Sequence, residues 1–326
     1  PPSGDGTYAF SASSNASVAL ANQLHTEDAN VGRAAAIDVV DRLGLGSGAY
    51  IVDGVSLSTM RRHAAQRGID VTAVPARHRQ GASLQIAPRV GLYRSWRGSA
   101  IDAGWTEHVL REYGFEPEVL RNREFRRGNL NARCDVILLA HEAPEHTLSG
   151  NSAGEYPPKY GGGIGDVGAA NLRIFVEQGG TVVALGAATL LLVQALYLPV
   201  VDALGGPAAE EFSSPGSMVR LLVDSSHPLG WGMEREAVAM FIDSPAFDVI
   251  PPGDASTSVV ARYPLSDPLV AGWMHGSQHL SGRGAVVEVE VGRGRAVLIG
   301  VRPQFRAQAR GTYRLLFNAL FRSTLQ

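Results

Sequence analysis

A buried strand that leads directly into an apolar helix constrains the fold of this chain most. Residues 181–185 form a short, almost wholly apolar run, which is typical of a strand buried on both faces of a parallel sheet. The run follows a helical pattern that stops at Gly179-Gly180, and it continues through residues 186–190 into a second apolar helix ending near Leu198. This alternation predicts an α/β fold built on a parallel sheet.

The turn after this strand also bears on function. Many α/β hydrolases and amidotransferases mount their nucleophile on such a turn, marked by Gly-x-Ser-x-Gly or Gly-x-Cys-x-Gly. In this chain Ala188 takes the nucleophile position, and a methyl group cannot attack a substrate. Thr189 comes one residue too late, and Leu190 replaces the second glycine. We therefore expect this turn to be catalytically inactive.

A glycine-rich loop precedes the first of these helices. Residues 163–168 match Gly-x-Gly-x-x-Gly, but the dinucleotide fingerprint also requires a strand directly before it. The preceding residues 156–160 contain Pro157-Pro158 and cannot form a central strand. The sequence therefore predicts a loop that leads into a helix beginning near Asp166, with that residue as the N-cap.

Composition narrows the class of protein. The 326 residues have room for two domains, and the formal net charge of -2 gives no broad electrostatic case for binding nucleic acid or an anionic membrane. No apolar run reaches the roughly 18 to 20 residues that cross a bilayer. The single cysteine, Cys134, excludes an intrachain disulfide framework and is expected to be a buried, inert thiol. Because the chain begins Pro1-Pro2 without a methionine, we expect an artificial or processed fragment.

The chain divides into two predicted domains. Residues 1–87 form a small α/β domain, either a ferredoxin-like sandwich or half of a wound sheet, and residues 77–88 form a polar linker. Residues 88–326 form a wound parallel sheet with a β-rich insertion at about 205–281. The expected strands are 8–10, 36–40, 49–52, 71–74, 90–93, 118–120, 135–140 and 181–185, followed by a hairpin of 285–291 with 295–300 and a terminal helix at 312–321.

Ligands of wound parallel sheets bind beyond the carboxyl ends of the strands. Arginines near the last strand-to-helix turn could hold an anionic ligand there, or could instead pair with carboxylates or cap carbonyls. We assign no catalytic residue. The candidate ligand-binding residues are Tyr93, Trp96, His141, Glu142, Ala188, Arg302 and Arg306.

The segment His141–His146 is similar to the zinc-protease pattern His-Glu-x-x-His but has one residue more. Histidines five residues apart, with Pro144 between them, do not share a helix face. A metal site in a loop, formed by His141, Glu142 and His146, remains an alternative to polar side chains that are hydrogen-bonded locally. We assign no metal ligand on this pattern.

Four motifs together resemble a known family. They are Gly104-Trp105-Thr106, residues 156–165 (YPPKYGGGIG), residues 175–181 (FVEQGGT), and residues 302–308 (RPQFRAQ) with 311–320 (GTYRLLFNAL). They look like the C-terminal region of large bacterial zinc carboxypeptidases of the M14 type, which is similar to class I glutamine amidotransferase domains with a flavodoxin-like fold. The resemblance covers residues 88–326 well and residues 1–87 loosely.

The resemblance implies a non-catalytic accessory or binding region. In such proteins the peptidase zinc ligands belong to a separate N-terminal domain, so no cofactor is expected in this segment, and Ala188 replaces the amidotransferase cysteine. The implied partners are the peptidase module of the same precursor and a peptide or glycan ligand, with homo-oligomerisation also open. Such families are usually exported, which implies a periplasmic or secreted setting. The alternative is a hydrolase with an unconventional site around His141 and Glu142.

Overall fold

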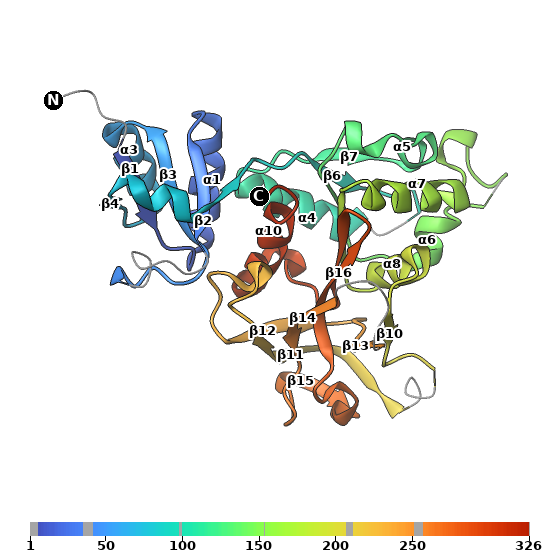
Figure 1. Cartoon of the computed structure of the whole chain (residues 1–326). Coiled ribbons are helices and arrows are strands. Elements are labelled where there is room, and N and C mark those ends of the chain that lie inside the picture. Colours follow the sequence, from blue (N-terminus) through green and yellow to red (C-terminus); the bar gives the residue numbers. More distant parts are fainter. Residues whose placement is uncertain are drawn as a thin grey trace.

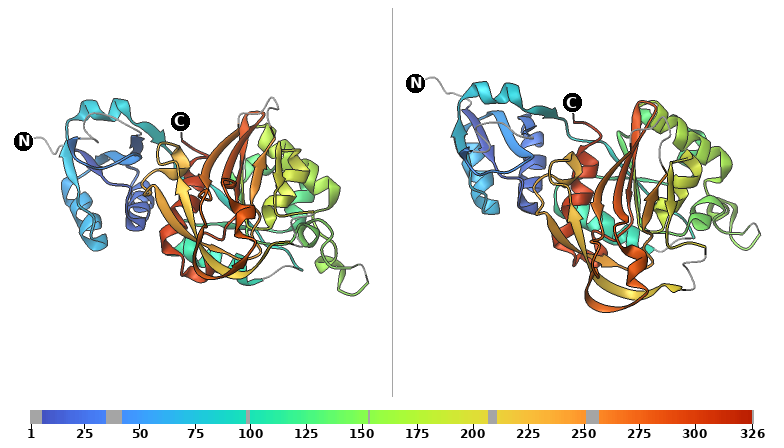
Figure 2. Two further views of the ribbon diagram at one scale, coloured as in Figure 1. Left: turned by 90° about the horizontal axis from the view of Figure 1, so that it is seen from below. Right: turned by 60° about the horizontal axis from the view of Figure 1, so that its bottom comes forward.

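The computed structural model describes residues 6–34, 42–97, 100–152, 154–206, 211–250 and 257–325, and these form two β-sheets (Figure 1). Strands within residues 6–85 make the first sheet, and strands within residues 90–299 make the second. The N-terminal unit lies at one end of the molecule, beside the terminal helix α10 (Tyr313–Phe321) (Figure 1, Figure 2). Within the described residues, no helix combines the length and apolar character needed to span a bilayer.

The N-terminal unit is an antiparallel sheet with helices on one face. The strand order is β4-β1-β3-β2-β5, and every neighbouring pair is antiparallel. The first four strands thus have the 4-1-3-2 order of a ferredoxin-like sandwich, which decides between the two predicted alternatives. The elements are β1 (Gly6–Phe10), α1 (Asn15–Thr26), β2 (Asn30–Ala34), β3 (Ala49–Val55), α3 (Leu57–Arg67), β4 (Thr72–Val74), a 3-10 turn (Ala76–Gly81) and β5 (Ser83–Gln85).

The predicted strand at 36–40 lies outside the described residues. The predicted polar linker at 77–88 is wrong, because β5 within it adds an edge strand to β2. A three-residue edge strand of sequence Ser-Leu-Gln has too little apolar pattern to stand out in a sequence.

The second sheet has a parallel core in the order β17-β9-β8-β6-β7. In chain order this is 5-4-3-1-2, the flavodoxin-like arrangement, and it confirms the predicted wound α/β sheet. The strands are β6 (Val90–Tyr93), β7 (Glu118–Leu120), β8 (Val136–Leu139), β9 (Thr181–Leu185) and β17 (Gly294–Ile299). The helices are α4 (Ala100–Glu112), α5 (Asn122–Arg127), α6 (Pro144–Leu148), α7 (Gly165–Glu177), α8 (Ala188–Leu196) and α10, with 3-10 turns at Leu130–Ala132, Pro158–Tyr160, Phe305–Ala307 and Arg310–Thr312.

Helices cover both faces of the parallel core. Val109 of α4 and Phe317 of α10 are buried in the hydrophobic cluster on one face. Phe125 of α5, Phe175 of α7 and Leu191 of α8 are buried in the cluster on the other. This double cover explains why the strand sequences are apolar throughout. One capping prediction is wrong: α7 begins at Gly165 without a side-chain cap, so Asp166 lies in the first turn.

The β-rich segment extends the same sheet rather than standing apart from it. β16 pairs antiparallel with β17 as the predicted hairpin, and β14, β11 and β12 follow in that order. Figure 2 shows these strands as a lobe beside the parallel core. The strands are β10 (Val200–Asp202), β11 (Ser213–Val223), β12 (Glu236–Phe241), β13 (Phe247–Val249), β14 (Thr257–Arg262), β15 (Leu269–His275) and β16 (Gly284–Val291), with 3-10 turns at Pro228–Gly230 and Ser277–Leu280.

Candidate functional site

The turn after β9 differs from the nucleophile elbow that the sequence predicts. The residue with left-handed backbone is Gly186, with φ +54°, and it directly follows the strand. Ala188 has no positive φ, begins α8 and is only 2% exposed, within the hydrophobic cluster on the α7–α8 face of the sheet. Thr189 is fully buried, and its hydroxyl donates a hydrogen bond of 2.6 Å to the carbonyl of Gly186. Neither Ala188 nor Thr189 therefore presents a side chain above the sheet.

His141 occupies the space above this turn. It follows β8, the strand next to β9, and its Nδ1 accepts a hydrogen bond of 3.1 Å from the backbone N–H of Ala187. A Cβ added to Gly186 would lie 2.3 Å from the same Nδ1, far inside van der Waals contact. The glycine is thus required here both by its backbone conformation and by the imidazole packed against it.

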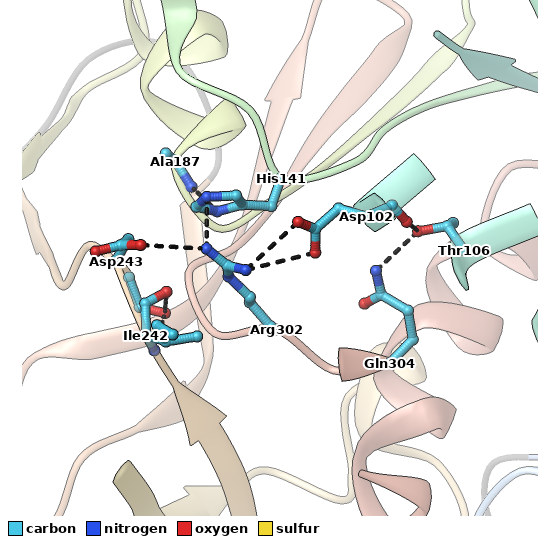
Figure 3. Close-up of polar contacts among 9 residues, drawn as sticks. Asp102, Thr106, His141, Ala187, Ile242, Asp243, Arg302 and Gln304 are labelled. Atoms are coloured by element: carbon cyan, nitrogen blue, oxygen red, sulfur yellow. Dashed lines mark hydrogen bonds and ion pairs between the residues drawn. The ribbon is translucent and has the colours of Figure 1, made fainter. Parts of the chain in front are cut away.

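Arg302, which follows β17, lies on the other side of this imidazole (Figure 3). Its Nη2 lies 2.6 Å from His141 Nε2 and 3.5 Å from Asp243 Oδ2, and its Nη1 lies 3.5 Å from both carboxylate oxygens of Asp102. The side chain is 8% exposed, and its buried Nε has no hydrogen-bond acceptor. The guanidinium is therefore buried, and its contacts with the two carboxylates are long rather than those of a tight bidentate pair.

The two ring nitrogens of His141 both face donors. A neutral imidazole has one acceptor nitrogen, so the Ala187 N–H and the Arg302 guanidinium cannot both make a full hydrogen bond to it at once. Burial, and then the charge of Arg302, lower the pKa of His141 to about 4. At neutral pH the ring is therefore uncharged, and the guanidinium beside it keeps it so.

Two carboxylates complete the arrangement. Asp102, in the first turn of α4, has a pKa raised mainly by burial, which the charges of Arg302 and Arg306 oppose. Gln304 Nε2 donates a hydrogen bond of 2.8 Å to Thr106 Oγ1, which in turn donates one of 2.7 Å to the Asp102 carbonyl (Figure 3). These bonds connect the segment that contains Arg302 and Gln304 to α4. Asp243, beyond β12, has φ +45° and a side chain that is 77% exposed. We call His141, Ala187, Arg302, Asp102 and Asp243 the His141–Arg302 site.

A pocket of about 400 Å³ opens beside this site, between α8 and the β-rich lobe. Ala187 and Asp243 belong to both the pocket wall and the site. The rest of the wall offers a second carboxylate, serine hydroxyls and aromatic rings, from Asp202, Ser213, Ser214, Ser244, Phe212 and Phe241. Burial raises the pKa of Asp202. The wall can therefore accept hydrogen bonds and provide apolar contact to a small polar ligand.

Three other candidate residues lie in a different group. Tyr93 is buried, and its hydroxyl donates a hydrogen bond of 2.7 Å to Asn122 Oδ1. Trp96 packs edge-on against Tyr160 and under the Arg121 guanidinium, which lies 3.8 Å from its ring centre. Tyr93 and Trp96 therefore make structural contacts rather than meeting His141.

Glu142 belongs to this second group. Burial raises the pKa of Glu142 to about 6, against hydrogen bonds from Ser95 and Thr147, and its Oε1 is buried without a hydrogen-bond partner. His146 Nδ1 lies 3.9 Å from that oxygen. In the part of the chain that the structure describes, no three histidine, cysteine or acidic side chains cluster as metal ligands would, so the loop-metal alternative has no geometric support.

Arg306, the remaining candidate, is exposed. Its backbone is left-handed, with φ +47°, and its guanidinium lies over the Phe305 ring, 5.1 Å from the ring centre. The structure thus brings together His141 and Arg302 near the Ala188 turn, but not the other candidates. Sequence reasoning missed Ala187, Asp102 and Asp243 as site residues, although the position of Asp102 after the first strand of the second domain was a usable signal.

No protein-family description and no curated protein matches this chain. Among solved structures, a ThuA-like protein from Bacteroides uniformis has a TM-score of 0.41 and 14% identity, over 73% of this chain and 92% of its own. A cytoplasmic protein from Salmonella typhimurium has a TM-score of 0.43 and 17% identity, over 71% and 96%. A Thermoplasma acidophilum protein described as part of a GMP synthase has a TM-score of 0.43 and 11% identity, over 72% and 94%.

Proposed function

We propose that this chain is a non-catalytic, ligand-binding accessory region of an exported zinc carboxypeptidase of the M14 type, with a degenerate amidotransferase-like site. One observation carries the non-catalytic part. The left-handed position of the turn after β9 is Gly186, and the His141 ring fills the space where a nucleophilic side chain would stand. A side chain introduced there would collide with the imidazole before it could reach a substrate.

The binding part of the proposal rests on the pocket beside the His141–Arg302 site. Its wall combines hydroxyls, aromatic rings and the carboxylates of Asp202 and Asp243. Such a wall suits a neutral or cationic ligand rich in hydroxyl or amide donors, since carboxylates accept hydrogen bonds and repel anions. A peptide or a glycan has this chemistry.

The partner part rests on the sequence resemblance alone. The motifs at residues 156–165, 302–308 and 311–320 support a peptidase module of the same precursor as the partner, with its zinc held by that module, and a periplasmic or secreted setting. The test is to express the module encoded in the same reading frame and measure its association with this chain by analytical ultracentrifugation. A saturable complex supports the assignment; separate sedimentation, or a reading frame without such a module, rejects it.

Ligand binding is tested by calorimetric titration with short peptides and with oligosaccharides. We expect saturable binding of one of the two classes, weakened at least tenfold by Asp243→Asn, because that carboxylate lines the pocket. The matched control is Asp70→Asn, which changes an exposed residue of the N-terminal unit and should leave the affinity unchanged. Equal affinities of the wild type and Asp243→Asn, or no binding of either class, would reject the pocket as the site.

A second candidate function is a hydrolase, favoured by the uncharged His141 and by the raised pKa of Glu142. A neutral imidazole can accept a proton, and a carboxyl group with a pKa of about 6 can donate one. However, the two side chains have separate partners: His141 contacts Ala187 and Arg302, whereas Glu142 contacts Ser95 and Thr147. This candidate predicts turnover that both His141→Ala and Glu142→Gln reduce.

A further inference from the structure

A second cavity, of about 330 Å³, lies where three parts of the chain meet, and it shares no lining residue with the pocket beside the His141–Arg302 site. Ser13 and Asn15 contribute from the start of α1, residues 232–234 and 236–238 from the β-rich lobe, and Arg310, Gly311 and Arg314 from the start of α10. A ligand in this cavity would touch both units of the molecule at once.

The cavity has a buried cation without a counter-ion in the part of the chain that the structure describes. Arg314 is only 4% exposed, and the one hydrogen bond that its side chain makes with the described residues runs from Nη2 to Asn15 Oδ1, at 3.3 Å. Its Nη1 is buried without an acceptor and lies beside Gly232, which is itself part of the cavity wall. Burial lowers the pKa of Arg314 to about 10; Tyr50 opposes that shift, but no carboxylate of the described residues does. A buried guanidinium in this state is costly and favours an added anion.

Other charges strengthen the positive character of this end of the cavity. Arg33 is 2% exposed, and the described residues that its guanidinium contacts are neutral, among them Gly48 O and the Tyr50 ring. Its charge further lowers the pKa of Arg314. The N-termini of α1, with twelve residues, and of α10, with nine, both contribute to the wall. Helix dipoles at such ends favour negative charge, although the Ser14 hydroxyl already accepts the Ala16 N–H at the start of α1.

Two glutamates also line the cavity. Glu234 is exposed and makes no ion pair with any described residue, whereas Glu236 is paired with Arg220. Among the described residues, the lining of the cavity therefore includes a buried guanidinium without a counter-ion and an exposed carboxylate without an ion pair. A simple dianion would satisfy the first group and be repelled by the second, whereas a molecule with both charges satisfies both.

We propose that this cavity binds a small zwitterion, a free α-amino acid, with its carboxylate on Arg314 and the N-terminus of α1 and its ammonium group toward Glu234. The space beside Gly311 is open, since a Cβ added there would meet no heavy atom within 4 Å. Because Asn15 and Arg314 belong to different units, the bound ligand holds the two units together. This site does not depend on the function proposed for the pocket near His141.

The test is thermal unfolding and calorimetric titration of the full chain with the standard L-amino acids, and with sodium acetate and inorganic phosphate as anions without an ammonium group. We expect at least one amino acid to raise the Tm saturably and to bind at least tenfold more tightly than acetate or phosphate. No amino-acid response, or equal binding of acetate or phosphate, overturns the assignment.

Variants locate the site. Arg314→Met should abolish the amino-acid response without lowering the Tm of the free protein, because it removes an uncompensated buried charge. Gly311→Asp should weaken amino-acid binding at least tenfold by placing a carboxylate in the open space, whereas Gly311→Ala should not. Asp243→Asn should leave the response unchanged, which separates this site from the pocket near His141. A response that survives both Arg314→Met and Gly311→Asp would overturn the proposal.

Discussion

His141 Nε2 lies 2.6 Å from Arg302 Nη2, although the two residues are 161 positions apart and follow different strands of the parallel sheet. The contact places a neutral ring directly above the glycine of a strand-to-helix turn, where related geometries mount a nucleophile. The top of this sheet is thus filled by a histidine–arginine pair with carboxylates around it.

Arg302→Met should destabilise the protein by about 2 to 3 kcal/mol, since it leaves the partly buried Asp102 without its cation. Urea denaturation measures this loss. Arg306→Met is the matched control, because that side chain is exposed, and it should change the free energy of unfolding by less than about 0.5 kcal/mol. Equal effects of the two substitutions would contradict the role assigned to Arg302.

The same substitution should raise the pKa of His141, because the charge of Arg302 is one of the two causes that lower it. NMR titration of the ring signals measures the shift. In the wild type we expect the ring to stay uncharged down to about pH 4, and in Arg302→Met to take up its proton at higher pH. An unchanged midpoint would show that burial alone sets the pKa.

Stability should fall as the solution is acidified from pH 6.5 to pH 4. The folded-state pKa of His141 is about 4, below the ordinary value of 6.5, so in this window the unfolded chain binds the extra proton. The stabilisation is complete above pH 6.5 and is lost through pH 4. His141→Gln should remove about 2 kcal/mol of this dependence, whereas His275→Gln, at an exposed residue, should not. His25, whose pKa is also about 4, contributes in the same direction.

Glu142→Gln should stabilise the protein by about 1 to 2 kcal/mol at pH 7. The folded-state pKa of Glu142 is about 6, raised from 4.5, so at neutral pH its buried carboxylate is destabilising, and that cost disappears as pH falls below 4.5. Chemical denaturation at pH 7 and at pH 4 measures the difference. Glu145→Gln changes an exposed neighbour and is the control. A destabilising Glu142→Gln would mean that the carboxylate has a partner which its raised pKa does not reflect.

Gly186→Ala should be much more costly than Gly46→Ala. Both glycines have positive φ, at +54° and +74°, but a Cβ on Gly186 would lie 2.3 Å from His141 Nδ1, whereas one on Gly46 would meet nothing within 4 Å. The Gly46 variant therefore measures backbone strain alone, about 1 kcal/mol, and we expect at least about 2 kcal/mol more at Gly186. Thermal unfolding compares the two, and equal losses would mean that His141 moves aside freely.

The sequence predicted the parallel core because β8 and β9 are buried on both faces and are therefore continuously apolar. It also placed His141 and Arg302 just beyond strands, at the edge of the sheet where the carboxyl ends of the parallel strands lie. It could not predict which of His141 and Glu142 contacts Arg302, because the side chains of consecutive residues in an extended segment point to opposite sides. Those two residues accordingly have different partners.

Other features were out of reach because they depend on distant packing. The motif spacing predicted Ala188 as the turn residue, but the residue with left-handed backbone is Gly186. A glycine is needed there because the His141 ring packs against it, and that contact comes from a distant part of the sequence. Asp243 reaches the site from the β-rich lobe, whose place beside the parallel core follows from pairing of β16 with β17. No local sequence pattern predicts that Asp243 lies near Arg302.

The central claim is that the top of the parallel sheet binds but does not catalyse. The most direct test is to assay the purified chain for hydrolysis of glutamine, carboxylic esters and peptides, beside His141→Ala. We predict that the two proteins give the same background rate on every substrate, because no side chain at the Gly186 turn can act as a nucleophile. Turnover by the wild type that His141→Ala abolishes would contradict the account and establish the hydrolase alternative.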